Sequence, residues 1–145
     1  MRYPLAILTA LVAACGSGAD NGFLADLEDH EAPLTAAPGD DLFTVEVFEA
    51  QRVYPTAGLT VLVNPYGGPV SAVEFALTVD EDGDGALGLG DILTAREGAE
   101  DAYNASHSGT LFEVVITFAD ESGATRDLAS LQWVGDGGLG LTSGL

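Results

Sequence analysis

The sequence predicts a mainly β protein whose folded part is an antiparallel β-sandwich. Between Phe43 and Trp133, short segments alternate apolar and polar residues with a period of two, which is the pattern of half-buried strands. Residues that favour turns separate these segments, for example Glu121-Ser122-Gly123. Several short strands with turns between them are typical of a sandwich.

The first fourteen residues have the features of a removed targeting signal. Arg2 gives the segment a positive start, and Pro4 to Ala14 is apolar except for Thr9. These eleven residues are too few to cross a bilayer as a helix, which needs about 20 residues. We therefore expect a signal peptide over residues 1–14 and leave it out of the folded part.

The signal ends in Leu11-Val12-Ala13-Ala14-Cys15, which resembles the lipobox of bacterial lipoproteins. The resemblance implies that the chain is cut before Cys15 and that acyl chains such as palmitate on this residue form a membrane anchor. Cys15 is the only cysteine, so an internal disulfide is excluded. The resemblance thus places the protein in the cell envelope or outside the cell. Gly16 favours the outer membrane if the cell is Gram-negative, and an ordinary secretory signal is the alternative.

Residues 15–40 form the next segment, which we expect to be a flexible acidic tether. It contains Gly16-Ser17-Gly18, several acids and two prolines, but few large apolar residues. Leu24 to Leu27 could form one helical turn, although nothing nearby would sustain a helix.

The charge of the chain is strongly negative. It carries 23 acidic residues against 4 basic ones, for a formal net charge of −19. Such a surface repels nucleic acid and anionic headgroups, so nucleic-acid partners are excluded. It attracts divalent cations, although a salt-rich habitat would also favour this composition.

Residues 41–134 are expected to form one Ig-like β-sandwich domain, followed by a glycine-rich tail over 135–145. The segment from Ile92 to Glu97 fits a strand or a short helix, and we favour the strand because no long helical period follows. The residues expected to face inward are Phe43, Val45 and Val47; Leu59, Val61 and Val63; Val73, Phe75, Leu77 and Val79; Phe112, Val114, Ile116 and Phe118; and Leu131 with Trp133.

The strongest chemical motif is the twelve-residue segment from Asp80 to Asp91. Acids occupy places one, three, five and twelve, where side chains point inward as the chain curls, and Gly85 permits the sharp bend. Leu87 supplies an apolar plug to the core. Ca²⁺ prefers six to eight oxygen ligands, and this spacing supplies them. The expected metal ligands are the side chains of Asp80, Asp82, Asp84 and Asp91 and the backbone carbonyl of Ala86.

This segment resembles the calcium loop of EF-hands, and more closely that of dockerin-type repeats, which commonly have Asp at place twelve. The resemblance implies Ca²⁺ as the bound ion. The preceding segment, Val73 to Val79, alternates as a strand, so the helix–loop–helix fold is not carried over. The cohesin-binding role of dockerins is not carried over either, because the chain has a single loop. The sequence therefore predicts an EF-hand-like calcium loop between strands.

No catalytic constellation stands out, and the expected protein is not an enzyme. His30 and His107 are expected to be surface residues, because no acid–His pair or nucleophile elbow is suggested by spacing. A carboxylate pair of the glycosidase type stays open. Tyr54, Tyr66 and Trp133 could stack on sugar rings if exposed, although alternation favours Trp133 in the core.

The sequence thus favours an exported, lipid-anchored, calcium-binding protein with a structural or binding role. Two alternatives stay open. One is a carbohydrate- or protein-binding module of an extracellular assembly. The other is a small secreted hydrolase or its accessory subunit.

Overall fold

A computed structural model describes residues 22–65, 70–99 and 102–135 of the chain. Within these ranges the protein is built from strands, two single-turn 3₁₀ segments (η1, Thr56–Gly58, and η2, Ala105–His107) and no α-helix. The predicted mainly β class is therefore confirmed. The strands are β1 (Leu24–Asp29), β2 (Asp41–Glu49), β3 (Tyr54–Pro55), β4 (Leu59–Pro65), β5 (Ser71–Val79), β6 (Ala86–Leu87), β7 (Ile92–Arg96), β8 (Leu111–Ala119) and β9 (Thr125–Val134).

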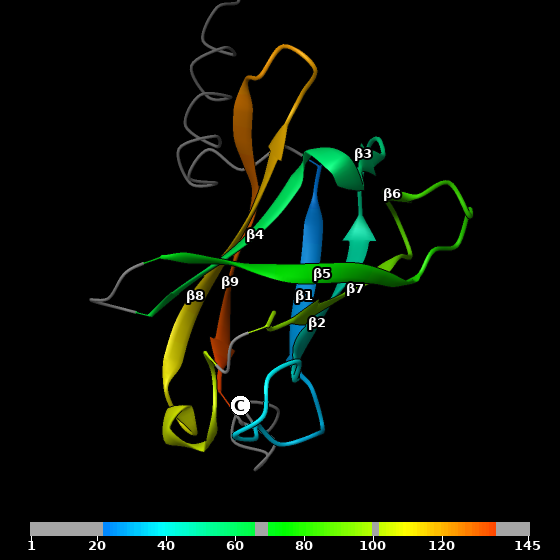
Figure 1. Cartoon of the computed structure of the whole chain (residues 1–145). Coiled ribbons are helices and arrows are strands. Elements are labelled where there is room, and N and C mark those ends of the chain that lie inside the picture. Colours follow the sequence, from blue (N-terminus) through cyan, green and yellow to red (C-terminus); the bar gives the residue numbers. More distant parts are fainter. Residues whose placement is uncertain (1–21, 66–69, 100–101, 136–145) are drawn as a thin grey trace, which may run out of the picture.

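Seven of these strands form one antiparallel sheet in the order β1-β2-β7-β5-β4-β8-β9, and β3 pairs with β6 beside it. The long strand β5 joins the two halves of the sheet. Its first part, Ser71–Val73, pairs with β4, and its second part, Glu74–Val79, pairs with β7. In Figure 1, β5 lies across the other strands, which fits a strand shared by two layers.

The sheet nearly closes, because its two edge strands meet. β1 and β9 lie in contact, and the indole Nε1 of Trp133 on β9 donates a hydrogen bond of 2.6 Å to Oδ1 of Asp29 on β1. Closing a sheet in this way covers strand edges that would otherwise be free to pair with other chains.

The core lies between the two halves of the sheet. Phe43 on β2 faces Trp133 on β9 across it, with ring centroids 5.2 Å apart. The residues predicted to face inward from β2, β4 and β8 are buried, which confirms the period-two interpretation of these strands. The predicted face of β5 is only half-buried, and Val79 at its end is exposed.

The segment before Asp41 differs from the expected flexible tether. Leu24–Asp29 forms β1, paired with β2 from Leu24↔Glu49 to Asp29↔Phe43, and not a helical turn. Phe23 and Leu34 are buried in the core cluster. The reason is that Ala25 and Leu27 cover the core from every second position while the acids between them face solvent. The folded domain thus includes Phe23 and β1.

Ile92–Arg96 is a strand, as favoured by the sequence.

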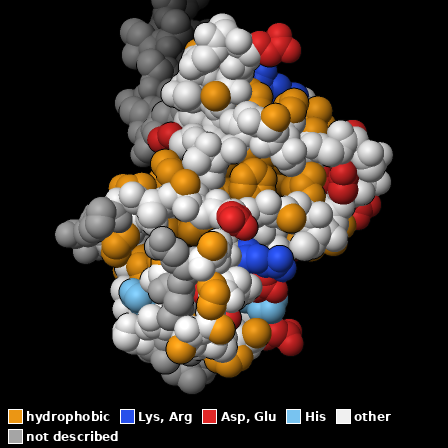
Figure 2. Space-filling model, viewed as in Figure 1, with side chains coloured by type: hydrophobic (Ala, Val, Ile, Leu, Met, Phe, Trp, Pro, Cys, Tyr) orange, Lys and Arg blue, Asp and Glu red, His pale blue; other side chains and the backbone are white. Residues whose placement is uncertain are grey.

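The expected signal peptide, the lipidation site Cys15 and the tail after Gly135 lie outside the described residues. Among the residues that are described, no helix is long and apolar enough to cross a membrane. Figure 2 shows hydrophobic side chains gathered above β5 on one face, with acidic side chains scattered around them.

Candidate metal centre

The loop that leaves β5 is folded around the carboxylate of Asp80. Its Oδ1 accepts a hydrogen bond from the backbone N–H of Gly83 at 3.0 Å, and its Oδ2 accepts one from Gly85 at 2.8 Å. Gly83 and Gly85 have φ angles of 67° and 71°. This left-handed conformation favours glycine, so the DGDG sequence allows the chain to curl around Asp80.

Asp91 closes the same loop from its other end, just before β7. Its side chain is buried, its Oδ1 accepts from the backbone N–H of Glu81 at 2.8 Å, and its Oδ2 accepts from Gly88 at 2.8 Å. One carboxylate thus ties the beginning of the loop to its end. Replacing this side chain would leave two donors of the loop without their acceptor.

Three carboxylates converge in the loop. One ligand oxygen each from Asp80, Asp84 and Asp91 lie within 4.8 Å of one another. Calcium–oxygen distances are about 2.3–2.6 Å, so two ligands on opposite sides of the ion are separated by about 5 Å. The observed spacing therefore fits a Ca²⁺ ion between the three side chains. Because a carboxylate has about four lone-pair sites, the backbone hydrogen bonds of Asp80 and Asp91 leave capacity for a metal.

The other residues of the predicted site occupy different places. Asp82 is exposed and is not part of the three-carboxylate cluster. Ala86 is buried and belongs to β6, where it pairs with Pro55. Leu87 is fully buried in the core cluster, so it occupies the position expected of the apolar plug.

The electrostatics of the loop favour the ionised form of Asp80. Hydrogen bonding from the backbone N–H of Gly85 is the main cause that lowers the pKa of this carboxyl below its ordinary value of 3.8. A carboxylate that stays ionised is the form that a hard cation requires.

The loop is fixed to the sheet next to it. The backbone N–H of Val47 on β2 donates to the carbonyl of Asp91 at 3.0 Å, and the N–H of Gly90 donates to the carbonyl of Val47 at 2.9 Å. Tyr54 on β3 pairs with Leu87 on β6. The second half of the loop, from Leu87 to Asp91, is therefore held by β2 and β3, and its first residue, Asp80, directly follows β5, which preorganises the cluster.

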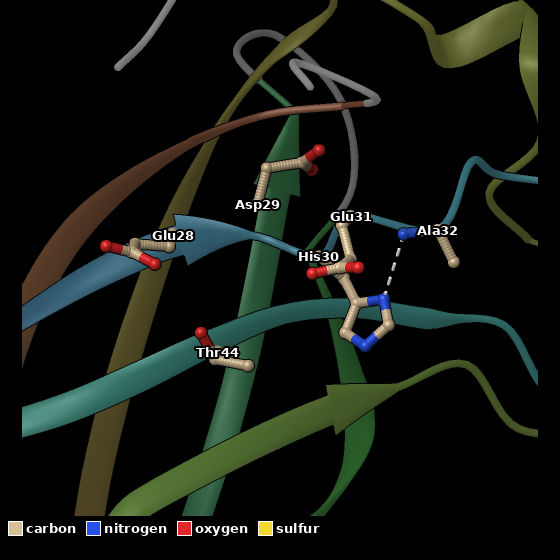
Figure 3. A pocket seen from close by; sticks show the side chains of 6 residues that line it. All are labelled: Glu28, Asp29, His30, Glu31, Ala32 and Thr44. Carbon is tan, nitrogen blue, oxygen red and sulfur yellow. Dashed lines mark hydrogen bonds between the residues drawn. The ribbon is translucent and has the colours of Figure 1, made fainter. Parts of the chain in front are cut away.

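A second feature is an open cleft of about 690 Å³ at the far end of β1. It is lined by Glu28, Asp29, His30, Glu31, Ala32 and Thr44. In Figure 3, the side chains come from β1, from the turn that follows it and from β2. His30 accepts a hydrogen bond from the N–H of Ala32 at Nδ1, which places Nε2 toward Asp41 at 3.6 Å.

The other histidine and the aromatic residues singled out in the sequence pack against neighbouring side chains of the fold. His107 accepts a hydrogen bond from the N–H of Asn104 and packs against the rings of Tyr103 and Phe112. Trp133 is buried, as the alternation of β9 predicts, and Tyr54 is buried as well. Tyr66 lies outside the described residues.

Sequence reasoning missed Glu97, which is buried directly after β7. Its Oε1 accepts from the N–H of Asp40 at 3.3 Å, and its Oε2 accepts from the N–H of Tyr103 at 3.0 Å. The carboxylate thus connects two loops that are far apart in the sequence. The only feature of the sequence that could have indicated this role is the position of Glu97, an acidic residue immediately after a buried strand.

Comparison with known proteins does not assign the chain to a family. No family model matches the chain, and no curated protein or solved structure matches it. Its function therefore has to be inferred from its own residues.

Proposed function

We propose that the chain is an exported, lipid-anchored protein whose β domain binds one Ca²⁺ ion in the loop from Asp80 to Asp91. The observation that carries the calcium site is the convergence of the carboxylates of Asp80, Asp84 and Asp91 within 4.8 Å. The role of the ion is structural, because it neutralises close carboxylates and stiffens the connection between β5 and β7. The three converging carboxylates form the centre of the proposed site. Asp82, which lies outside this cluster, and the backbone carbonyl of Ala86 are the remaining ligands proposed from the spacing of the loop.

The proposed affinity is weak, at a dissociation constant of about 10⁻⁴ to 10⁻³ M, which is typical of extracellular calcium modules. Such a value suits a protein that works outside the cytoplasm. The proposed anchor rests on the lipobox that ends at Cys15. We also propose that the β domain is an Ig-like sandwich, with the calcium loop between two of its strands.

Thermal melts with calcium and with a chelator test the metal site. Ligand that binds only the folded state adds about 2.7 kcal/mol at a hundredfold excess over its dissociation constant, so calcium should raise the melting temperature of the wild type. The double variant Asp80→Ala, Asp84→Ala should lose this response. Equal midpoints in the wild type, or a response that survives in the double variant, would contradict the site.

Metabolic labelling with a palmitate analogue tests the anchor. Wild-type protein should incorporate the label and Cys15→Ser should not. Equal labelling of both proteins, or of neither, would contradict lipidation at Cys15.

The cleft beside His30 keeps the hydrolase alternative as a second candidate. Glu28, Asp29 and Glu31 line it, and carboxylates are the groups that glycoside hydrolysis uses. Hydrolysis of a panel of aryl glycosides tests this candidate, and an activity that Glu28→Gln or Glu31→Gln abolishes would support it. Of the aromatic residues considered for sugar stacking, the two that lie in the described part of the chain, Tyr54 and Trp133, are buried, so neither supports the sugar-binding alternative.

A further inference from the structure

Four large apolar side chains are exposed around the calcium loop. They are Leu24, Phe48, Val53 and Leu89, with exposed fractions of 58%, 55%, 45% and 60%. We call this set the apolar patch. Single exposed apolar residues are normal, but a group of them next to one another marks a surface that contacts something else.

Backbone contacts place these residues next to one another. Leu24 lies opposite Glu49, the neighbour of Phe48, in the β1–β2 pair. On the other side of β2, the N–H of Gly90 donates a hydrogen bond to the carbonyl of Val47, so the backbone at Leu89 lies close to the backbone at Phe48. Val53 approaches Gly88, since a Cβ at that glycine would lie 3.0 Å from a methyl group of Val53. Phe48 thus lies on β2 between the chain positions of Leu24 and Leu89.

The described chain begins at this same end of the domain. Gly22 lies against Gln51, since a Cβ at Gly22 would be 2.7 Å from the Gln51 side chain. Figure 1 shows the start of β1 at the end of the sheet where β3 and β6 also lie. Cys15 precedes Gly22 by seven residues. Seven residues span at most about 25 Å when fully extended, so a lipid on Cys15 keeps the apolar patch close to the bilayer.

We propose that the apolar patch rests on the bilayer into which the lipid of Cys15 is inserted. This inference depends on the proposed lipid anchor and adds an orientation to it: the calcium loop faces the membrane, and the cleft at the far end of β1 faces away. The short connection favours a bilayer over a partner protein as the occupant. An amphipathic surface held at an interface buries its apolar side chains at the boundary between headgroups and acyl chains.

The charged residues near the apolar patch indicate which lipid headgroups it can contact. Glu46 and Glu49 lie on β2 with Phe48, and Asp82 and Asp84 belong to the loop that carries Leu89. All four acidic residues are exposed, and they outnumber Arg52, which is exposed next to Val53. These carboxylates repel anionic headgroups, so the patch suits a zwitterionic lipid such as phosphatidylcholine. Calcium in the loop would reduce the negative charge directly beside Leu89 and so strengthen the contact.

The test uses the full-length lipidated protein, reconstituted with calcium in phosphatidylcholine vesicles. Phe48→Trp places a fluorescent reporter in the apolar patch, and Leu89→Trp is a second reporter in case the first variant fails to fold. Leu111→Trp is the matched control, because Leu111 is exposed at the start of β8, where it pairs with Val134. The buried Trp133 gives the same background in all three variants.

Brominated phosphatidylcholine, which quenches tryptophan only at close range, is the readout, and vesicle flotation reports the anchor separately. We expect the patch reporters to lose emission by about twofold while the control stays unchanged, because residues at the interface reach the upper acyl chains. A protein that floats with unquenched patch reporters would overturn the docking and leave the anchor intact. If the emission of the patch reporters shifts to shorter wavelength on binding to vesicles but is not quenched, a second copy or another protein covers the patch, and this result would also overturn the proposal. A protein that does not float would overturn both the anchor and the docking.

Discussion

The indole of Trp133 donates a hydrogen bond of 2.6 Å to the carboxylate of Asp29, and this bond joins the two edge strands of the seven-stranded sheet. Trp133 is buried, and its ring also stacks on Phe112 at a centroid distance of 4.9 Å. The pair therefore connects the core to the seam between β1 and β9.

Asp29→Ala should destabilise the protein. The substitution removes the acceptor of a buried indole N–H, and hydrogen bonds to charged groups contribute about 1.5–3 kcal/mol. Urea denaturation should report a lower free energy of unfolding by about this amount. Asp26→Ala is the control, because Asp26 lies on the exposed face of the same strand and its loss should change stability by less than about 0.5 kcal/mol. Equal stabilities for the two variants would argue against the seam.

Removal of residues 1–40 should unfold the domain, whereas removal of residues 1–21 should leave it folded. The longer deletion takes away β1 together with Phe23 and Leu34, which are buried in the core cluster. The loss of one large buried side chain costs about 2–5 kcal/mol, and a domain of this size is stable by only about 5–15 kcal/mol. Circular dichroism of the two truncated chains checks this. A cooperative melt of residues 41–145 would show that β1 is dispensable.

Glu97→Ala should destabilise the protein by about 2–3 kcal/mol, because it leaves the backbone N–H groups of Asp40 and Tyr103 without their acceptor. Glu97→Gln keeps one carbonyl oxygen and should retain part of this stability. Equilibrium unfolding of the three proteins provides the measurement. The interpretation fails if the Gln variant is as unstable as the Ala variant.

Asp120 should make stability depend on pH. The side-chain hydroxyl of Ser122 is the main cause that lowers the pKa of this carboxyl below 3.8, and the N–H groups of Ser122 and Ala124 also contribute. Because the folded-state pKa is lowered, the stabilisation is present above the unfolded-state value and is lost as the pH falls through the folded-state value.

The melting temperature of the wild type should therefore exceed that of Asp120→Asn near neutral pH. The difference should shrink as the pH falls from the ordinary carboxyl pKa of 3.8 through the lower folded-state pKa of Asp120. A difference that stays constant down to about pH 2 would mean that the charge of Asp120 plays no role.

The strands that the sequence predicted are those with several large apolar residues on one face. Phe112 to Phe118 and Phe43 to Val47 alternate over a long enough stretch for their burial to follow from period alone. The strand β1 was missed because its core face holds only Ala25 and Leu27, set among acids that are typical of a solvated segment. Its strand conformation depends on pairing with β2, which is a property of the tertiary fold.

The carboxylates of the loop could be predicted because their spacing is local. Asp80, Asp84 and Asp91 lie within twelve residues, and the glycines between them decide how the chain curls. Partners that are distant in the sequence left no such signal. Asp29 meets Trp133 across 104 residues, and Glu97 meets Asp40 across 57. The cleft beside His30 likewise depends on how β1 and the turn after it pack on β2.

Direct titration of calcium is the measurement that tests the account at its centre. Isothermal titration calorimetry of the wild type should give one Ca²⁺ per chain with a dissociation constant of about 10⁻⁴ to 10⁻³ M. Asp84→Asn should weaken binding at least about tenfold, because it removes the charge of one of the three converging carboxylates. Asp120→Asn is the control, since Asp120 accepts similar hydrogen bonds in a turn outside the loop and its loss should leave binding unchanged. Absence of saturable binding in the wild type, or equal affinity in wild type and Asp84→Asn, would contradict the calcium site.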